Sequence, residues 1–304
     1  MFDNAEALCW ICWRLGIDIP TLKQALDERN AYRRVFIPKR GPKDRRKGRK
    51  RVLHVPPETL KQVQRRIHEV LLRPFKWPSP VHGFVSRRSH LTAAARHIGQ
   101  SALLTIDFKN AFDHLRHFQV YRVFVTRLHP DPRVAFWLGE LAMHRRRLPQ
   151  GAPSSPLIFN LVALDLDAWL SGFAKERGYT YTRYSDEVAV ASPRSIPFGE
   201  RMEIIGACRR FGFRIAPEKV RYQETRWGAL ELTNVLVRPQ GLGLSKRRVI
   251  DRIRALAHRA ISDPSVPPET IAGKIGWVSR VDPTKLHTRL RKPIQKLRRL
   301  GVLS

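Results

Sequence analysis

The sequence predicts an α+β fold, in which a central sheet packed with helices carries acidic residues at its strand ends and turns. The first observation behind this prediction is that short apolar stretches of strand character alternate with longer stretches of helical periodicity. The second is that the 304 residues are 42% hydrophobic, which is enough for a substantial core.

The charge of the chain indicates its class of partner. Lys and Arg number 57 and Asp and Glu number 26, so the net charge at pH 7 is +31. An excess of this size calls for a polyanionic partner, and nucleic acid is the usual one. A merely soluble basic protein, or one that binds an anionic membrane surface, is the alternative.

The three cysteines, Cys9, Cys12 and Cys208, fit a reducing compartment. Cys9 and Cys12 have metal-ligand spacing, but no second pair and no nearby histidine completes a zinc site, so we expect both to pack on an N-terminal helix. The first apolar run lacks the basic start of a signal peptide, and no apolar stretch reaches the ~20 residues of a membrane span. We therefore expect a cytoplasmic protein with no membrane partner.

The N-terminal third combines helices with a basic hairpin. Residues 1–30 have helical character, as do residues 57–73, which begin with Pro57 in a position suited to a first helical turn. Between them, Val35–Ile37 and Val52–Val55 flank a loop rich in Gly, Pro, Lys and Arg. This pattern predicts a β-hairpin whose basic tip binds phosphates, with a disordered charged loop as the alternative.

The middle of the chain supplies the acidic strand ends. Residues 101–107 form a short apolar strand that ends in Asp107, and residues 115–128 have helical character. A Gly- and Pro-rich loop follows Leu148, and residues 157–176 predict one long amphipathic helix.

The rest of the chain adds a hairpin and a basic C-terminal lobe. Residues 179–191 predict two strands joined by the polar tip Ser185-Asp186-Glu187. Helical character at 200–211 and strand-like pieces over 213–237 follow. The Pro-rich segment 262–269 predicts a linker, and 269–300 predicts two very basic helices.

Asp107, Asp186 and Glu187 are the residues in this pattern that point to chemistry. A carboxylate at the end of an apolar strand costs solvation free energy unless a cation meets it. Mg²⁺ prefers such oxygen ligands together with substrate phosphates, and two ions can activate a 3′-hydroxyl and stabilise a leaving pyrophosphate. Neutralisation by Lys or Arg, or ordinary turn aspartates, are the alternatives.

Six blocks in order resemble the reverse transcriptases of bacteria, especially the retron and group II intron lineage. They are FIPKRG with KRVLHVP, HGFVSRRSHLTAAARH at 82–97, LLTIDFKNAFDHL at 103–115, LPQGAPSSPLIFNL at 148–161, YTRYSDEVAVAS at 181–192 and GFRIAPEKVRY at 212–222. The resemblance implies a right-hand polymerase fold, with fingers, a palm of antiparallel sheet plus helices, and a helical thumb. It implies an N-terminal helical extension at 1–34, fingers at 35–100, palm at 101–240 and thumb at 241–304.

The resemblance also implies roles for individual residues. Asp107 and Asp186 match the pair that holds Mg²⁺ or Mn²⁺, with Glu187 in support, and Lys219 matches the lysine proposed to protonate the leaving pyrophosphate. A surface charge is the alternative for Lys219. The positions that match the deoxynucleotide-binding residues are Lys39, Arg51, Phe112, Gln150 and Gly151.

Two of these positions have a direct physical rationale. The aromatic ring of Phe112 would exclude a 2′-hydroxyl by overlap, so deoxynucleotides are favoured, and a core aromatic is the alternative. Gly151 lacks a side chain, which permits close backbone approach to a nucleotide.

The blocks depart from the family pattern in three places. The hairpin has Ser185-Asp186-Glu187 where the family has Ala-Asp-Asp, and we hypothesise that Glu187 changes metal preference or rate. Ala93 stands where retron enzymes carry Asn ahead of the matching His97. Asn234 stands where they carry Gly in Val-Thr-Gly.

The C-terminal lobe corresponds to the thumb, which grips the template–primer duplex through phosphates and backbone shape. A solvated basic face is the alternative, although like charges this dense repel one another without a polyanion. The residues that we expect to contact nucleic acid are Lys274, Arg280, Arg289, Arg291 and Lys292.

The function that the resemblance implies is RNA-directed DNA polymerisation, in which dNTPs extend a primer by two-metal nucleotidyl transfer. We expect a standalone retron-type enzyme that uses a structured noncoding RNA, acts in antiphage defence and pairs with an effector protein. Two alternatives stay open: a catalytically silent RNA-binding scaffold of the same fold, and an untemplated or protein-primed DNA polymerase.

Overall fold

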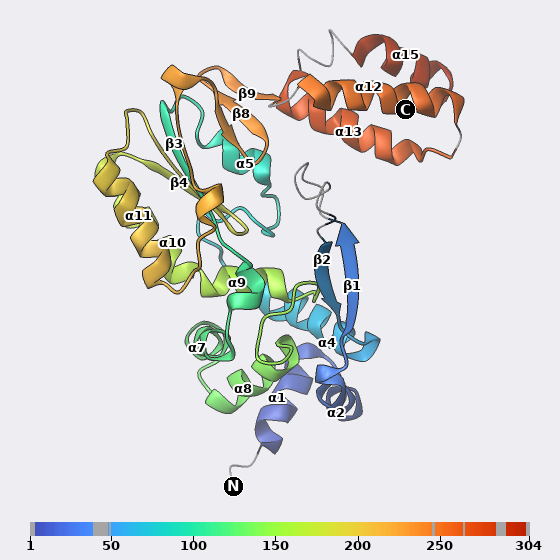
Figure 1. Ribbon diagram of the computed structural model, residues 1–304. Helices are drawn as coiled ribbons and strands as arrows, with labels where there is room; N and C mark the ends of the chain where they lie inside the picture. The colour runs from blue at the N-terminus through green and yellow to red at the C-terminus, as the bar shows by residue number, and fades with distance from the viewer. Residues whose placement is uncertain are drawn as a thin grey trace.

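The structure is a computed structural model that describes residues 4–38, 48, 50–244, 247–263, 265–283 and 290–301. The structure has a helical base, a central sheet and a C-terminal helical bundle (Figure 1). A hairpin rises from the base toward the bundle (Figure 1). The mixture of helices with antiparallel sheets confirms the predicted α+β class.

The base contains the N-terminal helices and two helices from the middle of the chain. Its helices are α1 (Ala5–Leu15), α2 (Ile19–Asp27), α4 (Glu58–Arg66), α7 (His117–Arg127) and α8 (Pro132–Ala142). A 3₁₀ turn at Glu28–Asn30 follows α2, and a π-helical segment, Ile67–Leu72, extends α4. Cys12 is buried on α1 and Cys9 is exposed there, and all three cysteines are free.

The predicted hairpin is confirmed. Strands β1 (Arg33–Pro38) and β2 (Lys50–Val55) are antiparallel, with Val35 opposite Leu53. The predicted basic tip between them, including Lys39, lies outside the described residues, apart from position 48.

The central sheet has the strand order β4-β5-β3-β6, with every neighbouring pair antiparallel. Its strands are β3 (Ala102–Asp107), β4 (Thr180–Tyr184), β5 (Glu187–Ser192) and β6 (Arg221–Glu224). A 3₁₀ turn at Pro217–Lys219 leads into β6.

Side chains of this sheet alternate between two cores, as the two-residue period of a strand requires. Leu104 and Ile106 of β3 join a large core with helices α10 (Leu164–Arg177) and α11 (Phe198–Arg210). Leu103 faces the other way, into a second core with Leu230 and Val235. A sheet covered on both faces is rigid, so its strand ends hold fixed positions.

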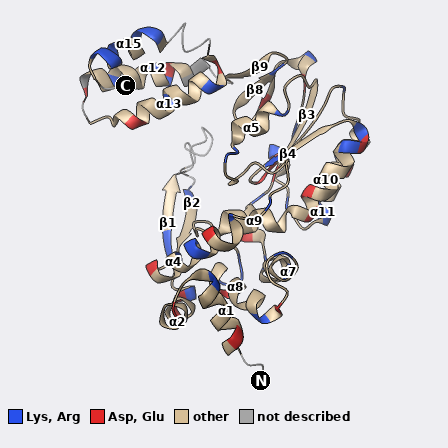
Figure 2. Cartoon of the chain, turned by 180° about the vertical axis from the view of Figure 1, so that it is seen from behind, with Lys and Arg blue, Asp and Glu red and all other residues tan. Residues whose placement is uncertain are grey.

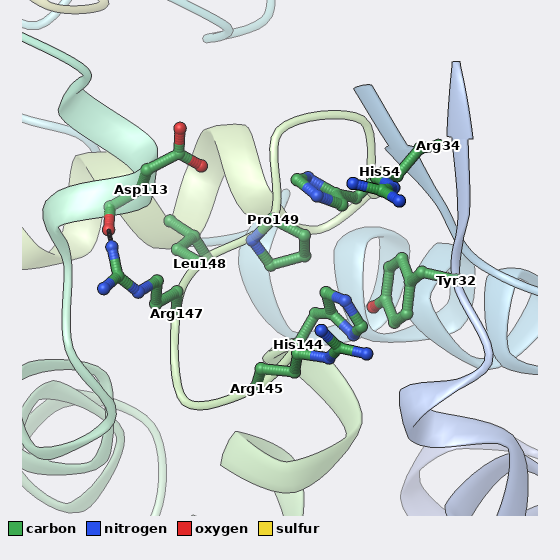
Figure 3. A pocket seen from close by; sticks show the side chains of 9 residues that line it. All are labelled: Tyr32, Arg34, His54, Asp113, His144, Arg145, Arg147, Leu148 and Pro149. Atoms are coloured by element: carbon green, nitrogen blue, oxygen red, sulfur yellow. Dashed lines mark hydrogen bonds between the residues drawn. The ribbon is translucent and has the colours of Figure 1, made fainter. Parts of the chain in front are cut away.

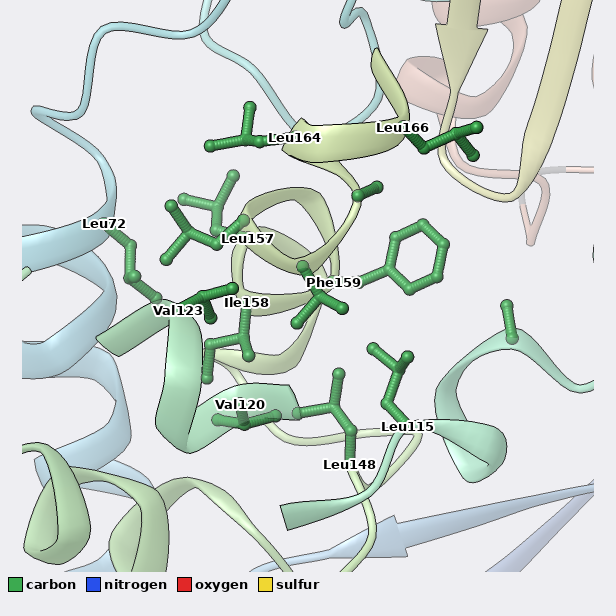
Figure 4. Close-up of a cluster of buried hydrophobic side chains, with 14 of the residues drawn as sticks. Leu72, Leu115, Val120, Val123, Leu148, Leu157, Ile158, Phe159, Leu164 and Leu166 are labelled. Atoms are coloured by element: carbon green, nitrogen blue, oxygen red, sulfur yellow. The ribbon is translucent and has the colours of Figure 1, made fainter. Parts of the chain in front are cut away.

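One correction concerns the segment that was expected to form a single helix over 157–176. It forms two helices, α9 (Ser155–Val162) and α10, which are bent by 50° at the break. Every residue of α9 except Pro156 is buried, and Figure 4 shows Leu157, Ile158 and Phe159 inside a ring of apolar side chains from surrounding segments. The bend lets α9 fill the core beneath the sheet while α10 packs along it.

A small second sheet covers the other face, with strands β7 (Leu230–Leu232), β8 (Val235–Arg238) and β9 (Gly241–Leu244) and helix α5 (His90–Ala95). Thr233 and Asn234 join β7 to β8 with φ of 49° and 64°. Asn tolerates this left-handed conformation better than most residues, so Asn234 preserves a turn where the family has Gly.

Within the described residues, the C-terminal bundle includes the helices α12 (Arg247–Ser262), α13 (Pro268–Val281) and α15 (Arg291–Arg299). The last two match the predicted helical stretches, and the Pro-rich linker lies before α13, whereas α12 was not predicted. Ile253 and Val278 of the bundle join the second core, so the bundle packs against the small sheet. The expected domain boundaries stay predictions, although β9, assigned to the thumb, pairs with β8.

Among the described residues, no single helix is long and apolar enough to cross a membrane. The bent pair α9 and α10 passes the same test of length and composition when its two helices are taken together.

Two short helices complete the part of the fold around the site. Helix α6 (Ala111–His114) follows β3, and α5 begins with a capping box in which Ser89 and Thr92 satisfy each other's backbone donors. Ala93 is buried in α5, and His97 beyond it bonds through Nε2 to Thr182 Oγ1 at 2.7 Å. The histidine shared with retron enzymes is therefore a core residue here.

Candidate active site

The sheet brings the three predicted acidic residues to one end. Asp107 is the last residue of β3 and is the register partner of Glu187, the first residue of β5. Asp186 lies in the turn before Glu187, and the Phe108 N–H donates to its carbonyl oxygen at 3.0 Å. Antiparallel pairing thus unites residues almost eighty positions apart in the sequence.

The carboxylates repel one another in a partly buried setting. Burial raises the pKa of Glu187 to about 7, and the nearby Asp107 and Asp186 add to the rise. Burial also raises the pKa of Asp107, and the hydrogen bond from Lys219 opposes this while Asp186 reinforces it. Ionisation of these carboxyl groups is disfavoured, and a divalent cation bound among them would stabilise their charged forms.

Lys219 already neutralises part of this charge. Its Nζ lies 2.6 Å from Asp107 Oδ1, and the lysine is half exposed. Within the described ranges, no group of three or more His, Cys, Asp or Glu side chains is arranged to hold a metal ion. The donor set still fits Mg²⁺, because that ion takes one or two carboxylates and completes its shell with water and substrate phosphates.

A buried network holds the turn that carries Asp186. The Arg183 guanidinium donates to the Ser185 carbonyl oxygen at 2.9 Å and to Asn160 Oδ1 at 2.8 Å. It also pairs in two-pronged fashion with Asp167, at 2.8 Å from Nε and 2.7 Å from Nη2. Arg183 and Asp167 are 0% and 1% exposed, so the pair sits deep in the core.

The far side of the turn is held by Gly83. Asn160 Nδ2 donates to the Gly83 carbonyl oxygen at 2.7 Å, and a Cβ on Gly83 would lie 2.2 Å from the backbone nitrogen of Ser185. No side chain fits there. Ser185 itself has a φ of 57°, a left-handed conformation that persists only when its surroundings enforce it.

Sequence reasoning missed Arg183, Asp167, Asn160 and Gly83. Each lies inside or near a block that the sequence analysis quoted or described, yet their partnership joins a loop, two helices and a strand. An arginine in the middle of a predicted strand was the one available signal, because such a charge is almost never buried without a partner.

A cavity of about 490 Å³ opens beside the acidic residues and gathers most of the predicted nucleotide-binding residues. Its lining includes Arg51, Phe112, Gln150, Gly151, Asp186 and Lys219, together with Lys50, Phe84, Asn110 and Ser155, which were not predicted. The buried Ser155 hydroxyl has no hydrogen-bond partner in the described part of the chain, so a polar group is available to a ligand there. Lys39 lies outside the described residues.

Phe112 and Gly151 also make contacts within the protein that explain their residue types. The Phe112 ring packs on Phe159 at a centroid distance of 5.2 Å, so this half-buried aromatic belongs to the core and lines the cavity. Gly151 has a φ of 123°, and a Cβ there would lie 2.9 Å from the His54 carbonyl oxygen. The His54 N–H in turn donates to the Gln150 carbonyl oxygen at 2.8 Å, which ties the hairpin to this loop.

The predicted nucleic-acid residues lie on the C-terminal bundle. Lys274 and Arg280 are exposed on α13, and Arg291 and Lys292 are exposed on α15, while Arg289 lies outside the described residues. None of the four described residues forms a salt bridge with the described part of the chain. Figure 2 shows Lys and Arg along α15.

Comparisons with known proteins agree with this geometry. Residues 37–241 match the family model described as "Reverse transcriptase (RNA-dependent DNA polymerase)". The chain is 32% identical to the retron Mx65 reverse transcriptase of Myxococcus xanthus, over 92% of this chain and 70% of that protein. It is 28% identical to the retron Ec86 reverse transcriptase of Escherichia coli, over 88% of this chain and 81% of the relative.

A solved structure shares the fold. The telomerase of Candida albicans, solved in complex with a fragment of telomeric RNA, superposes with a TM-score of 0.50 at 10% identity. The match covers 86% of this chain and 56% of the telomerase chain, and at this identity it shows the right-hand polymerase fold alone.

The family model covers more than half of the chain, and a retron enzyme aligns at more than 30% identity over most of both sequences. The chain therefore belongs to the reverse transcriptases, the RNA-directed DNA polymerases, and is of the retron type.

Proposed function

We propose that Asp107, Asp186 and Glu187 hold Mg²⁺ and that the adjoining cavity binds a deoxynucleoside triphosphate for addition to a primer on an RNA template. The observation that carries this proposal is the strand register, which places Asp107 opposite Glu187. Asp186 precedes Glu187 in the turn between β4 and β5. Bound there, Mg²⁺ or Mn²⁺ would supply Lewis-acid stabilisation of developing negative charge.

The chain's own residues account for the remaining chemistry. Arg51 and Lys50 line the cavity and can neutralise triphosphate charge, as can Lys39 if the hairpin tip reaches the same ligand. Lys219 holds a proton on Nζ at the cavity wall, where a leaving pyrophosphate could take it. Phe112 presents a ring that would exclude a ribose 2′-hydroxyl.

The test is incorporation of labelled dNTPs on a primed RNA template. Asp186→Asn should abolish incorporation, whereas Asp165→Asn should keep it, because Asp165 is a half-exposed acid that pairs with Arg122 and Arg127 instead. Glu187→Asp restores the family residue and reports whether Glu187 changes the rate or the preference between Mg²⁺ and Mn²⁺. Full activity of Asp186→Asn would overturn the metal assignment.

We further propose that the bundle binds the template–primer duplex and that the natural template is a structured noncoding RNA. The exposed cations on α13 and α15 support the first part, since phosphate contacts of this kind dominate affinity. The similarity to retron reverse transcriptases supports the second part. A role in antiphage defence, with an effector protein in the cytoplasm, is part of the same proposal and rests on the family resemblance alone. Sequencing the nucleic acid that co-purifies with the chain tests it, and a random RNA population would contradict it.

A catalytically silent scaffold of the same fold predicts a different result. Such a protein would bind RNA yet incorporate no label with Mg²⁺ or Mn²⁺. Untemplated or protein-primed synthesis would give a product whose sequence does not follow the added template. Sequencing the product of one primer-extension reaction separates all three functions.

A further inference from the structure

A second cavity, of about 430 Å³, adjoins the nucleotide cavity, and Asp113 lines both. Its walls come from the hairpin and from the loop that precedes Gln150 (Figure 3). The volume falls in the range of about 300–1,000 Å³ that small-molecule sites occupy. None of the residues assigned to the reaction above lines this cavity.

Three arginines give the cavity a positive charge. Arg34 comes from β1, while Arg145 and Arg147 come from the turn after α8. Arg147 donates to the backbone carbonyl oxygen of Asp113 at 3.3 Å. In the described part of the chain, neither Arg34 nor Arg145 forms a salt bridge. Asp113 is the single acidic residue of the lining, so an anion is favoured there.

Three rings line the side of the cavity near the hairpin. The rings of Tyr32 and His144 lie 4.3 Å apart between centroids, and those of His54 and His144 lie 5.4 Å apart. The Tyr32 hydroxyl accepts from Gln64 Nε2 at 2.8 Å, which fixes the orientation of that ring. The three rings therefore pack on one another, and a nucleobase can pack against such an aromatic cluster.

His144 also offers an unsatisfied polar atom. Its Nδ1 is buried with no hydrogen-bond partner in the described ranges, where a native side chain normally has one. Burial lowers the pKa of His144, with further lowering by His54 and Arg145, so the ring is neutral at pH 7. A neutral imidazole can donate to or accept from the edge of a base.

The turn that presents Arg145 is strained. His144 and Arg147 exchange two backbone hydrogen bonds, at 2.9 and 3.0 Å, around Arg145 and Arg146. Both central arginines have positive φ, 48° and 59°, where Asn-Gly is the favoured pair. Arginine is unusual in this conformation, and of the two residues only Arg145 lines the cavity.

We propose that this cavity binds a nucleoside phosphate, either as a free nucleotide or as one residue of an RNA strand. The base packs against the cluster of rings that Tyr32, His54 and His144 form, and the phosphate meets Arg34 and Arg145. Asp113 accepts a hydrogen bond from a ribose hydroxyl or an exocyclic amine. The inference rests on the proposed function in one respect, that an enzyme copying RNA meets unpaired RNA beside its nucleotide cavity.

Two matched pairs of variants test the binding. Arg145→Gly and Arg146→Gly relieve the same left-handed strain and remove the same charge, yet only Arg145 lines this cavity. Arg34→Ala and Arg33→Ala remove neighbouring charges on one exposed strand, and only Arg34 lines the cavity. The probe is a fluorescently labelled single-stranded RNA of eight nucleotides. Its binding to each variant is measured by fluorescence anisotropy in the presence of EDTA.

We expect Arg145→Gly and Arg34→Ala each to raise the Kd for this RNA about fivefold, and Arg146→Gly and Arg33→Ala less than twofold. An RNA that carries 4-thiouridine should crosslink to peptides containing Tyr32 or His144. Equal losses within each pair, or crosslinks confined to the C-terminal bundle, would overturn the proposal.

Competition with guanosine monophosphate identifies the source of the ligand. Displacement of the crosslink by the free nucleotide assigns the cavity to free nucleotides, whereas displacement by unlabelled RNA alone assigns it to a strand. Either result supports a nucleoside phosphate site. Primer extension keeps this test separate from the proposed function. Normal primer extension by Asp186→Asn would overturn the catalytic assignment and leave the cavity proposal intact. RNA binding at the parental Kd by both Arg145→Gly and Arg34→Ala would overturn the cavity proposal alone.

Discussion

Two pairs of aspartate with a basic residue lie within the same domain and differ in their surroundings. Asp167 and Arg183 are almost fully buried, and each carboxylate oxygen and most guanidinium nitrogens have partners. Asp107 and Lys219 meet through one bond at 2.6 Å, with 25% and 54% of their side chains exposed. The same charges therefore serve two purposes.

The difference shows how the molecule separates support from chemistry. A buried, fully bonded pair fixes geometry and cannot exchange partners without leaving an uncompensated charge. A partly exposed pair with a single bond can open to admit a metal ion or a phosphate at small cost. Arg183 joins the two regions, because it holds the Ser185 carbonyl directly beside Asp186.

The largest effect that we expect is loss of synthesis when the open region loses a carboxylate. Asp107→Asn should lower primer extension by about 10³-fold or more, since a charge that stabilises the transition state is removed. It should leave the melting temperature unchanged or raised, because the repulsion that raises the pKa of Glu187 is relieved. Steady-state primer extension and thermal unfolding measure the two quantities.

The buried region should respond in the opposite way. Arg183→Met leaves the Asp167 carboxylate buried without its cationic partner and should lower the free energy of unfolding by roughly 3–5 kcal/mol. Arg122→Met, which breaks an exposed pair with Asp165, should cost about 0–1 kcal/mol and is the matched control. Urea unfolding measures both. Similar values for the two variants would remove the contrast between the regions.

A double variant sharpens the comparison further. Arg183→Met combined with Asp167→Leu replaces the buried charges with apolar groups and should regain much of the lost stability. Its activity should stay low, because nothing then holds the Ser185 carbonyl and the turn that carries Asp186. Recovery of full activity together with stability would show that Arg183 has no positioning role.

Lys219 should affect activity with little effect on stability. Lys219→Met should slow incorporation by about 10²-fold through loss of a proton donor, while the free energy of unfolding changes by less than about 1 kcal/mol. The kcat for incorporation should fall more than the KM for the dNTP rises. A change confined to KM would assign Lys219 to substrate binding alone.

The last prediction concerns the pH dependence of stability, to which His97 and Glu187 contribute with opposite signs. Burial lowers the pKa of His97 to about 3 from 6.5, so its contribution is present above pH 6.5 and is lost as pH falls toward 3. Burial raises the pKa of Glu187 to about 7 from 4.5, so its contribution is present below pH 4.5 and is lost as pH rises through 7.

Thermal unfolding in EDTA across pH 4–8 tests these signs. Glu187→Gln should become stabilising relative to the parent chain as pH rises from 4.5 to 8, and added Mg²⁺ should remove that advantage. His97→Gln should flatten the loss of stability on the acid side. A Glu187→Gln profile parallel to the parent profile would contradict the assigned pKa.

The elements that the sequence predicted share local signals. The hairpin around residues 35–55 and the strand that ends at Asp107 each combine an apolar run with turn residues at the border, and both formed as expected. The failure has a tertiary origin. Residues 157–176 read as one amphipathic helix, and the break near Ala163 reflects the shape of the core rather than any Gly or Pro.

By itself, the sequence pointed to the polymerase family and predicted which residues carry the chemistry, because ordered motifs and a net charge of +31 depend only on residue type and spacing. The tertiary structure alone decided how those residues are held, through contacts such as Arg183 with Asn160 and Asp167, or Gly83 against Ser185. It also formed the basic cavity around His144 from segments far apart in the chain. A buried polar group must find its partner in space, and no periodicity along the chain specifies where that partner lies.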